Sequence, residues 1–277
     1  MISQSFLPSL LLREYVRKYH IRHFEFDDSI NLPFKPYPPR PEQGLVFYPR
    51  ESETVEYVDE GLKYQRPHSM IMGQYTIRTN RHTAKDFIVL IADFQPGVLH
   101  RLTGIPINEL TNKDVDAVSV FGKELRLVNE RLNSTGNYQE MIDIVETFLF
   151  LIINGSRKDS HRVDEIGKMI YAHSGKFSLD WLARQACLCQ RQFERKFKER
   201  LGVGPKTYSR ISRLYQTYKM KVDHPGEDWL SIALACGYHD YQHLAKDYRE
   251  FSNSTPAGLF HENDKAPEKQ FGLPETF

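Results

Sequence analysis

The clearest pattern of apolar and polar positions occurs twice in the C-terminal part of the chain. Residues 182–188 (Leu-Ala-Arg-Gln-Ala-Cys-Leu) and residues 232–238 (Ile-Ala-Leu-Ala-Cys-Gly-Tyr) each combine an apolar residue with an alanine, where a second helix can approach closely. A tight turn follows each stretch, and then come two apolar residues four positions apart, which lie on one face of a helix. These pairs are Phe193 with Phe197, and Leu244 with Tyr248. The repeated pattern predicts two helix-turn-helix units, about fifty residues apart.

The first part of the chain has a different periodicity. Residues 10–19 carry apolar side chains at helical spacing, which predicts a short amphipathic helix. From residue 20 to residue 94, β-rich runs that alternate in places are separated by turn residues, most densely at 33–41. The predicted strands are residues 21–26, 45–48, 55–58, 70–79 and 87–94.

Helical spacing returns after the predicted strands. Apolar residues three and four positions apart predict helices over residues 115–132 and 138–153. Strands followed by helices are typical of an α+β domain. The apolar stripe of residues 138–153 either pairs two chains or packs on the domain's own sheet. The polar, turn-prone residues 154–160 then predict a linker to the helical part of the chain.

Residues 165–260 resemble the DNA-binding domain of the AraC/XylS family of bacterial transcription regulators. The similarity extends beyond the repeat to several short motifs. These motifs are Phe177-Ser178-Leu179, Arg195-Lys196-Phe197, residues 201–208 (Leu-Gly-Val-Gly-Pro-Lys-Thr-Tyr), residues 235–240 (Ala-Cys-Gly-Tyr-His-Asp), His243-Leu244, Asp247-Tyr248 and residues 251–256 (Phe-Ser-Asn-Ser-Thr-Pro). The resemblance implies that a linker helix begins within 201–208, runs to about Val222 and joins the two units.

Two residues of the first unit depart from the family pattern. Cys187 stands where the family usually has a turn glycine, and Cys189 stands where it usually has a serine that caps the helix. A thiol is a weaker hydrogen-bond acceptor than a hydroxyl, so it caps a helix poorly. We therefore expect the first unit to be less stable or differently angled, with its fold retained.

The N-terminal half resembles the β-barrel-like sensory domains that precede such DNA-binding units. Residues 94–97 (Phe-Gln-Pro-Gly) and 102–107 (Leu-Thr-Gly-Ile-Pro-Ile) carry this resemblance. It implies a small-molecule or regulatory domain, and it leaves open an unidentified small-molecule effector and a homodimer. The expected fold class is an α+β N-terminal domain, with a β-barrel-like sheet plus helices, followed by an all-α domain with two helix-turn-helix units joined by a linker helix. The expected boundaries are 1–155, 156–262 and a polar C-terminal tail at 263–277.

The charge of the chain is unevenly distributed. The formal net charge is +1, but residues 157–221 contain 16 Lys and Arg against 6 Asp and Glu. Of the totals of 37 basic and 36 acidic residues, 21 and 30 remain for the rest of the chain. A basic segment beside an acidic remainder suits a polyanion as partner, although a solvated helical surface would look the same. The helical repeat favours nucleic acid.

The resemblance assigns base reading to the second helix of each unit. This helix enters the major groove, where arginine can pair with guanine, glutamine with adenine and glutamate with cytosine. The expected DNA-binding residues are Gln190, Arg191, Glu194, Arg195 and Lys198 in the first unit, and Tyr241, Gln242, His243 and Lys246 in the second. Several of them could instead touch only phosphate or solvent. Arg210 and Arg213 are candidates either for phosphate contacts or for packing of the linker helix.

A stiff linker helix would restrict how both units meet one DNA duplex. Two helices in successive major grooves on one face lie about 34 Å apart. Either the DNA bends, at a cost on the order of 1–6 kcal/mol, or the second helix inserts incompletely. Because the second unit contains Asp240, Asp247 and Glu250, we expect it to bind less tightly.

The cysteines and the apolar runs indicate the compartment. Cys187, Cys189 and Cys236 occupy apolar helical positions, which predicts buried thiols in a reducing compartment. A metal or redox role for the first two would need further ligands that the sequence does not place. The first residues lack a signal-peptide pattern, and the longest apolar run, 148–153, is too short to cross a membrane. We expect a cytoplasmic protein.

Sequence patterns of catalysis are not found. The histidines of the first half lack the H-x-H or H-E-x-x-H spacing of a metal site, and P-loop, G-x-G-x-x-G and G-x-S-x-G patterns do not occur. These histidines are His20, His23, His68, His82 and His100. The sequence predicts no enzyme, no cofactor and no metal site. The hypothesis is a sequence-specific, double-stranded-DNA-binding transcription regulator. The alternative is a ligand-binding or protein-interaction module whose helical repeat no longer reads DNA.

Overall fold

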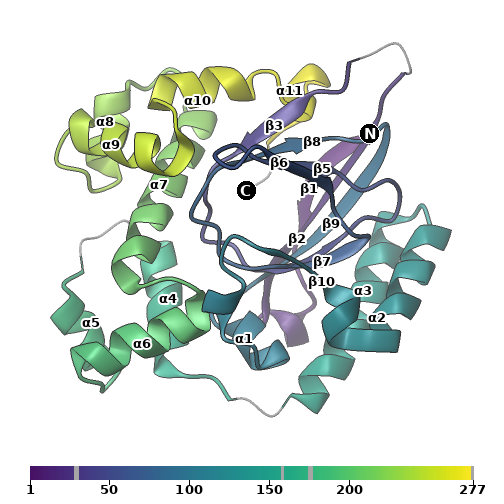
Figure 1. Cartoon of the computed structure of the whole chain (residues 1–277), viewed down its shortest axis with the longest axis horizontal. Helices are drawn as coiled ribbons and strands as arrows, with labels where there is room; N and C mark the ends of the chain where they lie inside the picture. Colours follow the sequence, from purple (N-terminus) through teal and green to yellow (C-terminus); the bar gives the residue numbers. More distant parts are fainter. Residues whose placement is uncertain (28–30, 157–158, 174–176, 276–277) are drawn as a thin grey trace.

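The N-terminal half consists of two antiparallel sheets that enclose an apolar core (Figure 1). The computed structural model describes residues 1–27, 31–156, 159–173 and 177–275. One sheet has the strand order β1-β2-β9-β4-β7-β10, and the other has the order β3-β8-β5-β6. The strands are β1 (Ile2–Phe6), β2 (Val16–Glu25), β3 (Phe34–Tyr37), β4 (Gly44–Phe47), β5 (Thr54–Tyr57), β6 (Leu62–Gln65), β7 (Ser69–Met72), β8 (Thr79–His82), β9 (Asp86–Phe94) and β10 (Asp114–Asp116).

Strand β9 lies inside the larger sheet and is apolar on both faces. Phe87, Val89 and Ile91 point into the core between the sheets, whereas Ile88 and Leu90 join the core beneath the helices. Successive side chains of a strand alternate between its faces. Because both faces of β9 are covered, the strand reads as a continuous apolar run in the sequence.

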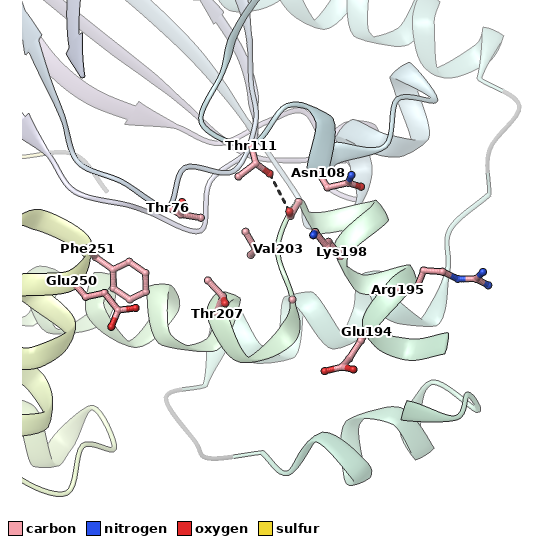
Figure 2. A pocket seen from close by; sticks show the side chains of 12 residues that line it. Thr76, Asn108, Thr111, Glu194, Arg195, Lys198, Val203, Thr207, Glu250 and Phe251 are labelled. Carbon is pink, nitrogen blue, oxygen red and sulfur yellow. Dashed lines mark hydrogen bonds between the residues drawn. The ribbon is translucent and has the colours of Figure 1, made fainter. Parts of the chain in front are cut away.

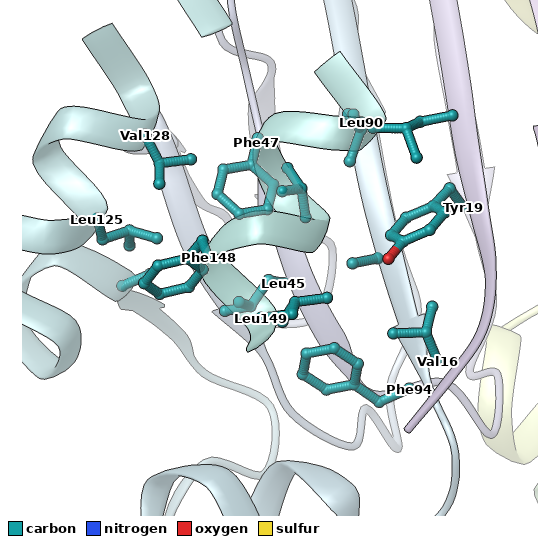
Figure 3. Packing of buried hydrophobic residues seen from close by; sticks show 14 of the residues in the cluster. Val16, Tyr19, Leu45, Phe47, Leu90, Phe94, Leu125, Val128, Phe148 and Leu149 are labelled. Carbon is teal, nitrogen blue, oxygen red and sulfur yellow. The ribbon is translucent and has the colours of Figure 1, made fainter. Parts of the chain in front are cut away.

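Helices α2 (Ala117–Ser134) and α3 (Tyr138–Gly155) cover the outer face of the larger sheet. Figure 3 shows Phe148 and Leu149 of α3 beside Phe47 of β4, in a core that is closed to solvent. The apolar stripe of residues 138–153 therefore packs on the domain's own sheet, which was one of its two expected roles. Shorter elements of this half are the 3-10 helices η1 (Leu10–Leu12) and η2 (Ile107–Glu109) and the helix α1 (Val98–Thr103).

The C-terminal part is all-helical and has two apolar cores that share α7. Tyr208 of α7 packs in the first core with α5 and α6, and Ile211 and Leu214 pack in the second core with α8 and α9. One helix inside both cores joins the two units stiffly, and the fold class expected from the sequence is confirmed. The helices are α4 (Arg162–Ala172), α5 (Leu179–Gln185), α6 (Gln190–Leu201), α7 (Pro205–Asp223), α8 (Trp229–Ala235), α9 (Tyr241–Ser252), α10 (Pro256–Asn263) and α11 (Pro267–Gln270).

The expected helix at residues 10–19 is wrong. Only η1 is helical there, and β2 begins at Val16. The pairing of β2 with β9 shifts between Val16 and Lys18, so a bulge places Val16 and Tyr19 on the same buried face three residues apart. A bulge inserts one extra residue into the alternation, and here it imitates helical spacing. The expected strand at 70–79 is likewise two strands, β7 and β8, with a loop between them.

The segment that the sequence presents as a polar tail packs against the N-terminal sheets. Figure 1 shows α11 beside β3. Beyond α11, Phe271 stacks on Phe24 with ring centroids 5.8 Å apart, and Leu273 also packs against the core between the sheets. Residues 276 and 277 of the expected tail lie outside the described residues, as do 157 and 158 of the expected linker.

Substitution of Leu149 by alanine tests the packing of α3 on the sheet. Leu149 is fully buried, so Leu149→Ala should lower the free energy of unfolding by about 2–5 kcal/mol. Leu151 on the same helix is 58% exposed, and Leu151→Ala should change that free energy by less than about 0.5 kcal/mol. Urea unfolding followed by circular dichroism measures both. Equal effects of the two substitutions would contradict the packing described here.

Candidate nucleic-acid interface

The first helix-turn-helix unit buries the residues that its sequence pattern marks as apolar. Leu182 and Ala183 of α5 pack against Phe193 and Phe197 of α6. The opposite side of α6 faces solvent. All five candidate DNA-binding side chains of this unit are exposed, namely Gln190, Arg191, Glu194, Arg195 and Lys198. Helix α6 thus presents three cationic groups, one amide and one carboxylate on its outer face.

The turn between α5 and α6 contains two exposed cysteines. Cys187 has a φ of 55°, a left-handed conformation that glycine adopts without steric cost. Cys189 is the N-cap residue of α6, and its backbone N–H and its thiol donate to Gln192 Oε1 at 3.5 and 3.3 Å. The expectation of three buried thiols is wrong for these two, because both lie in the turn, and correct for Cys236. Burial of Cys236 raises the pKa of its thiol to about 11.

The second unit repeats this geometry with the usual turn residues. Gly237 has a φ of 79°, and the Asp240 carboxylate caps α9 by accepting a hydrogen bond from the His243 backbone N–H at 2.9 Å. That hydrogen bond lowers the pKa of Asp240. Gln242, His243 and Lys246 are exposed on the outer face of α9. The fourth candidate, Tyr241, is partly buried against the core of the unit.

The acidic residues of α9 are bound by the linker helix α7. Arg210 Nη2 lies 2.7 Å from an Asp247 oxygen and 2.6 Å from a Glu250 oxygen. The hydrogen bond with Glu250 raises the pKa of Arg210, although the burial of Arg210 acts in the opposite direction. The same hydrogen bond lowers the pKa of Glu250. Arg213 lies over the ring of Tyr238 at 4.8 Å. Of the two expected roles, the structure supports packing of the linker helix for both arginines.

The two second helices border one face of α7. Lys206, Arg210 and Arg213 line two adjoining hollows, one shared with Glu194 of α6 and the other with Lys246 of α9. One candidate residue of the first unit, Glu194, and two of the second, His243 and Lys246, therefore border the same face of α7.

The N-terminal domain holds the C-terminal end of α6. Gln43 Nε2 donates to the Leu201 carbonyl at 2.9 Å, and the Thr111 hydroxyl donates to the Gly202 carbonyl at 3.0 Å. A side chain at Gly202 would lie 2.9 Å from Gln74 Cβ, and its φ of 90° also favours glycine. The domains can approach this closely only because position 202 has no side chain.

A hollow lies where the N-terminal domain meets α6 and α9 (Figure 2). Thr76 and Thr111 of the N-terminal domain line it together with Arg195 and Lys198 of α6. Glu250 of α9 lies on the same hollow. Two candidate DNA-binding residues therefore border the same hollow as the N-terminal domain. Sequence patterns did not identify Gln43, Thr76 or Thr111 as residues that contact α6 or border the hollow. The glycines in residues 201–208 were the available signal that another part of the chain approaches closely there.

The histidines of the first half are separated by the fold. The Nδ1 atoms of His20, His23 and His100 are hydrogen-bonded to Ser5, Tyr138 and the Ile105 carbonyl, respectively, and Nε2 of His82 to Glu56. Within the part of the chain that the structure describes, no group of three or more His, Cys, Asp or Glu could hold a metal ion. Among the same residues, no helix combines the length and the apolar character needed to cross a bilayer.

Two sequence families match the two halves of the chain. The family described as "Helix-turn-helix domain" matches residues 182–261, and "Domain of unknown function (DUF6597)" matches residues 4–116. The HTH-type transcriptional regulator ArgR of Pseudomonas aeruginosa is 32% identical over 77 residues, which are 28% of this chain and 23% of that protein. The chain thus spans about a quarter of the length of that curated relative.

Solved structures with a similar arrangement include ToxT from Vibrio cholerae, with a TM-score of 0.48 and 10% identity over 86% of this chain and 96% of that chain. A transcriptional regulator with an AraC-type DNA-binding domain from Chromobacterium violaceum has a TM-score of 0.33 and 27% identity, over 38% of this chain and 93% of that chain.

The fold and the matched families define a two-domain protein in which a sheet-rich domain precedes a double helix-turn-helix domain. The second domain is a helix-turn-helix domain of the AraC type, as its motifs indicate.

Replacement of Cys187 by glycine tests the strain in the first turn. An L-residue in the left-handed conformation costs roughly 1–2 kcal/mol, and glycine relieves this strain. The greater conformational freedom of glycine in the unfolded chain offsets part of the stabilisation. Cys187→Gly should therefore stabilise the first unit by about 0.5–1 kcal/mol, whereas Gly237→Ala should destabilise the second unit by about 1–2 kcal/mol.

Each unit contains one of the two tryptophans, Trp181 in α5 and Trp229 in α8. Urea unfolding followed by tryptophan fluorescence therefore reports on each unit when the other tryptophan is replaced by phenylalanine. Destabilisation of the first unit by Cys187→Gly would show that the thiol contact with Arg162 outweighs the backbone strain.

Proposed function

We propose that the chain is a transcription regulator that binds double-stranded DNA in a sequence-specific manner through α6 and α9. The observation that supports this most is the repeated geometry. In each unit a first helix with two buried residues and a left-handed turn precede a second helix whose outer side chains are exposed. Both second helices border the basic face of α7.

The first unit supplies the stronger set of contacts in this proposal. Arg191 and Arg195 are the guanine-reading candidates, Gln190 suits adenine, and Glu194 suits cytosine. Lys198, one turn from Glu194, suits a phosphate. In the second unit, the exposed Gln242, His243 and Lys246 extend the contact. Arg210 pairs with both Asp247 and Glu250 and offsets one of their two negative charges, so these acids contribute less repulsion of DNA than their number suggests.

The N-terminal domain controls DNA binding in this proposal. Its side chains bind the carbonyls at the end of α6 and border the hollow beside Arg195 and Lys198. A small molecule or a partner that shifts this domain would therefore move the first base-reading helix. A ligand acts in this way only when it binds one of the two arrangements more tightly than the other.

The replacement of Arg195 by alanine tests base reading. Arg195→Ala should weaken binding by roughly 1–3 kcal/mol at particular base pairs and relax sequence preference there. Arg126→Ala is the matched control, because Arg126 is an exposed arginine on α2 in the other domain. The chain's affinity for the DNA upstream of its own gene, and for single-base variants of that DNA, is measured by mobility shift.

If Arg191→Ala and Arg195→Ala together left specific binding equal to that of Arg126→Ala, base reading by α6 would be refuted. The alternative, a ligand-binding or protein-interaction module whose repeat no longer reads DNA, would then be favoured.

The salt dependence of binding tests the role of Lys198. Loss of one phosphate contact should lower the slope of log affinity against log salt by about 0.9 and weaken all sequences alike. Lys198→Ala should behave in this way, and Lys123→Ala on α2, also exposed, should not change the slope. A base-dependent loss with an unchanged slope would reassign Lys198 to base reading.

A further inference from the structure

Two glutamates near the C-terminal end of the described chain are buried in the N-terminal domain. Glu268 of α11 is 1% exposed, and the side chain of Glu275 is also 1% exposed. Transfer of a carboxylate into a protein interior is strongly unfavourable unless cations and hydrogen bonds surround it. Cations of the N-terminal domain therefore have to hold residues 267–275, which we term the C-terminal segment.

Three buried cations meet these carboxylates. Lys35 Nζ on β3 lies 2.8 Å from Glu268 Oε1 and 3.0 Å from Glu275 Oε1. Arg22 on β2 lies 3.6 Å from Glu268, and Arg40 lies 3.5 Å from Glu275. Glu268 is thus bound by one cation from each sheet, at the point where the two sheets face each other.

The N-terminal domain does not neutralise this site by itself. In the described part of the chain, both carboxylates recorded within ion-pair distance of Lys35 belong to the C-terminal segment, as does the one recorded for Arg22. Arg40 has a carboxylate of its own domain within ion-pair distance, Glu42 at 3.9 Å. Removal of one partner from a buried ion pair leaves an uncompensated charge. In this structure, the two carboxylates of the C-terminal segment compensate the positive charge of this site.

Both glutamates remain ionised in this position. Burial acts to raise the pKa of Glu268, but the charges of Lys35 and Arg22 lower this pKa to about 2. Lys35 and Arg40 likewise lower the pKa of Glu275 against the effect of burial. Apolar contacts add to this binding, because Phe271 stacks on Phe24 and lies 5.0 Å from the Phe26 ring centroid.

Glu275 also connects the site to the linker helix. The Tyr218 hydroxyl of α7 donates to Glu275 Oε1 at 3.0 Å, and the Asn263 amide donates to Glu275 Oε2 at 2.9 Å. Arg40 lies 5.9 Å from the centroid of the Tyr218 ring. The C-terminal segment therefore holds the N-terminal domain and α7 together.

We propose that the C-terminal segment is an internal ligand, and that a short dicarboxylate such as succinate or glutarate competes with it for Arg22, Lys35 and Arg40. The Oε1 atoms of Glu268 and Glu275 lie within about 6 Å of each other, since they are 2.8 and 3.0 Å from the same nitrogen. The two carboxylates of a short diacid span a similar distance. Its entry displaces Glu275 and releases Tyr218 of α7.

The double variant Glu268→Gln plus Glu275→Gln, in the full chain, tests the site. These substitutions keep the shape of the segment but remove its charge, so the internal competitor is weakened. The affinity of this variant for succinate should be higher than that of the wild-type chain by about tenfold or more. Further replacement of Lys35 by methionine should abolish the binding. Isothermal titration calorimetry at constant ionic strength measures each affinity, with acetate as the monocarboxylate comparison.

Lys269→Gln is the matched control, because it removes an exposed charge from the same segment and should bind succinate as the wild-type chain does. Hydrogen exchange of residues 267–275 supplies a second readout that does not depend on the double variant. Saturating succinate should speed exchange in the wild-type segment, and Lys35→Met should speed it without ligand.

Succinate binding that equals acetate binding, or that survives Lys35→Met, would overturn the proposal, as would unchanged exchange in both experiments. The effect of the displacement on DNA binding rests on the proposed function. Calorimetry and exchange involve no DNA, so the two proposals can fail separately.

Discussion

The hydrogen bonding of the C-terminal end of α6 is the constraint on which the rest of the arrangement depends. The last carbonyls of a helix have no partner within the helix and need one elsewhere. In this protein Gln43 and Thr111 of the N-terminal domain supply the donors for Leu201 and Gly202. The N-terminal domain thus satisfies the last carbonyl groups of α6, the helix that carries the candidate base-reading residues. The orientation of that helix is a property of both domains.

Buried ion pairs lie on both sides of the same junction. Arg200 of α6 binds Asp164 of α4 through two contacts of 2.6 Å, and Arg17 of β2 binds Asp93 while lying 3.8 Å from the Tyr171 ring centroid. Buried pairs contribute little net stability, because desolvation offsets their attraction, but a misplaced partner is costly. Each pair therefore fixes the arrangement inside its own domain, and the contact of Arg17 with the Tyr171 ring crosses between the domains.

Helix α7 contacts both helix-turn-helix units and the C-terminal segment. It contributes to the cores of both helix-turn-helix units, binds α9 through Arg210, and meets the C-terminal segment through Tyr218. In the proposed competition with a diacid, a change at the buried carboxylates near the sheets would therefore reach the helix that joins the two units. Coupling of this kind requires a continuous set of packed contacts that can adopt two arrangements, and α7 is the element that both sites share.

The sequence by itself determined the features that are periodic over a few residues. The spacing of Phe193 with Phe197, and of Leu244 with Tyr248, predicted both helix-turn-helix units and the side of each second helix that faces outward. The outward residues of α6 and α9 followed from the same spacing, while their contacts with DNA stay a prediction. The apolar runs of β4 and β9 were also visible, because strands covered on both faces carry few polar residues.

Tertiary structure alone decided the features that join distant parts of the chain. Lys35 and Glu268 are 233 residues apart, and no local pattern links a lysine in a strand to a glutamate in a polar terminal segment. The bulge within β2 concealed the start of that strand, and the turn geometry exposed two cysteines that their apolar neighbours suggested were buried. Periodicity reports which face of an element is covered, whereas the identity of the covering partner depends on how the whole chain packs.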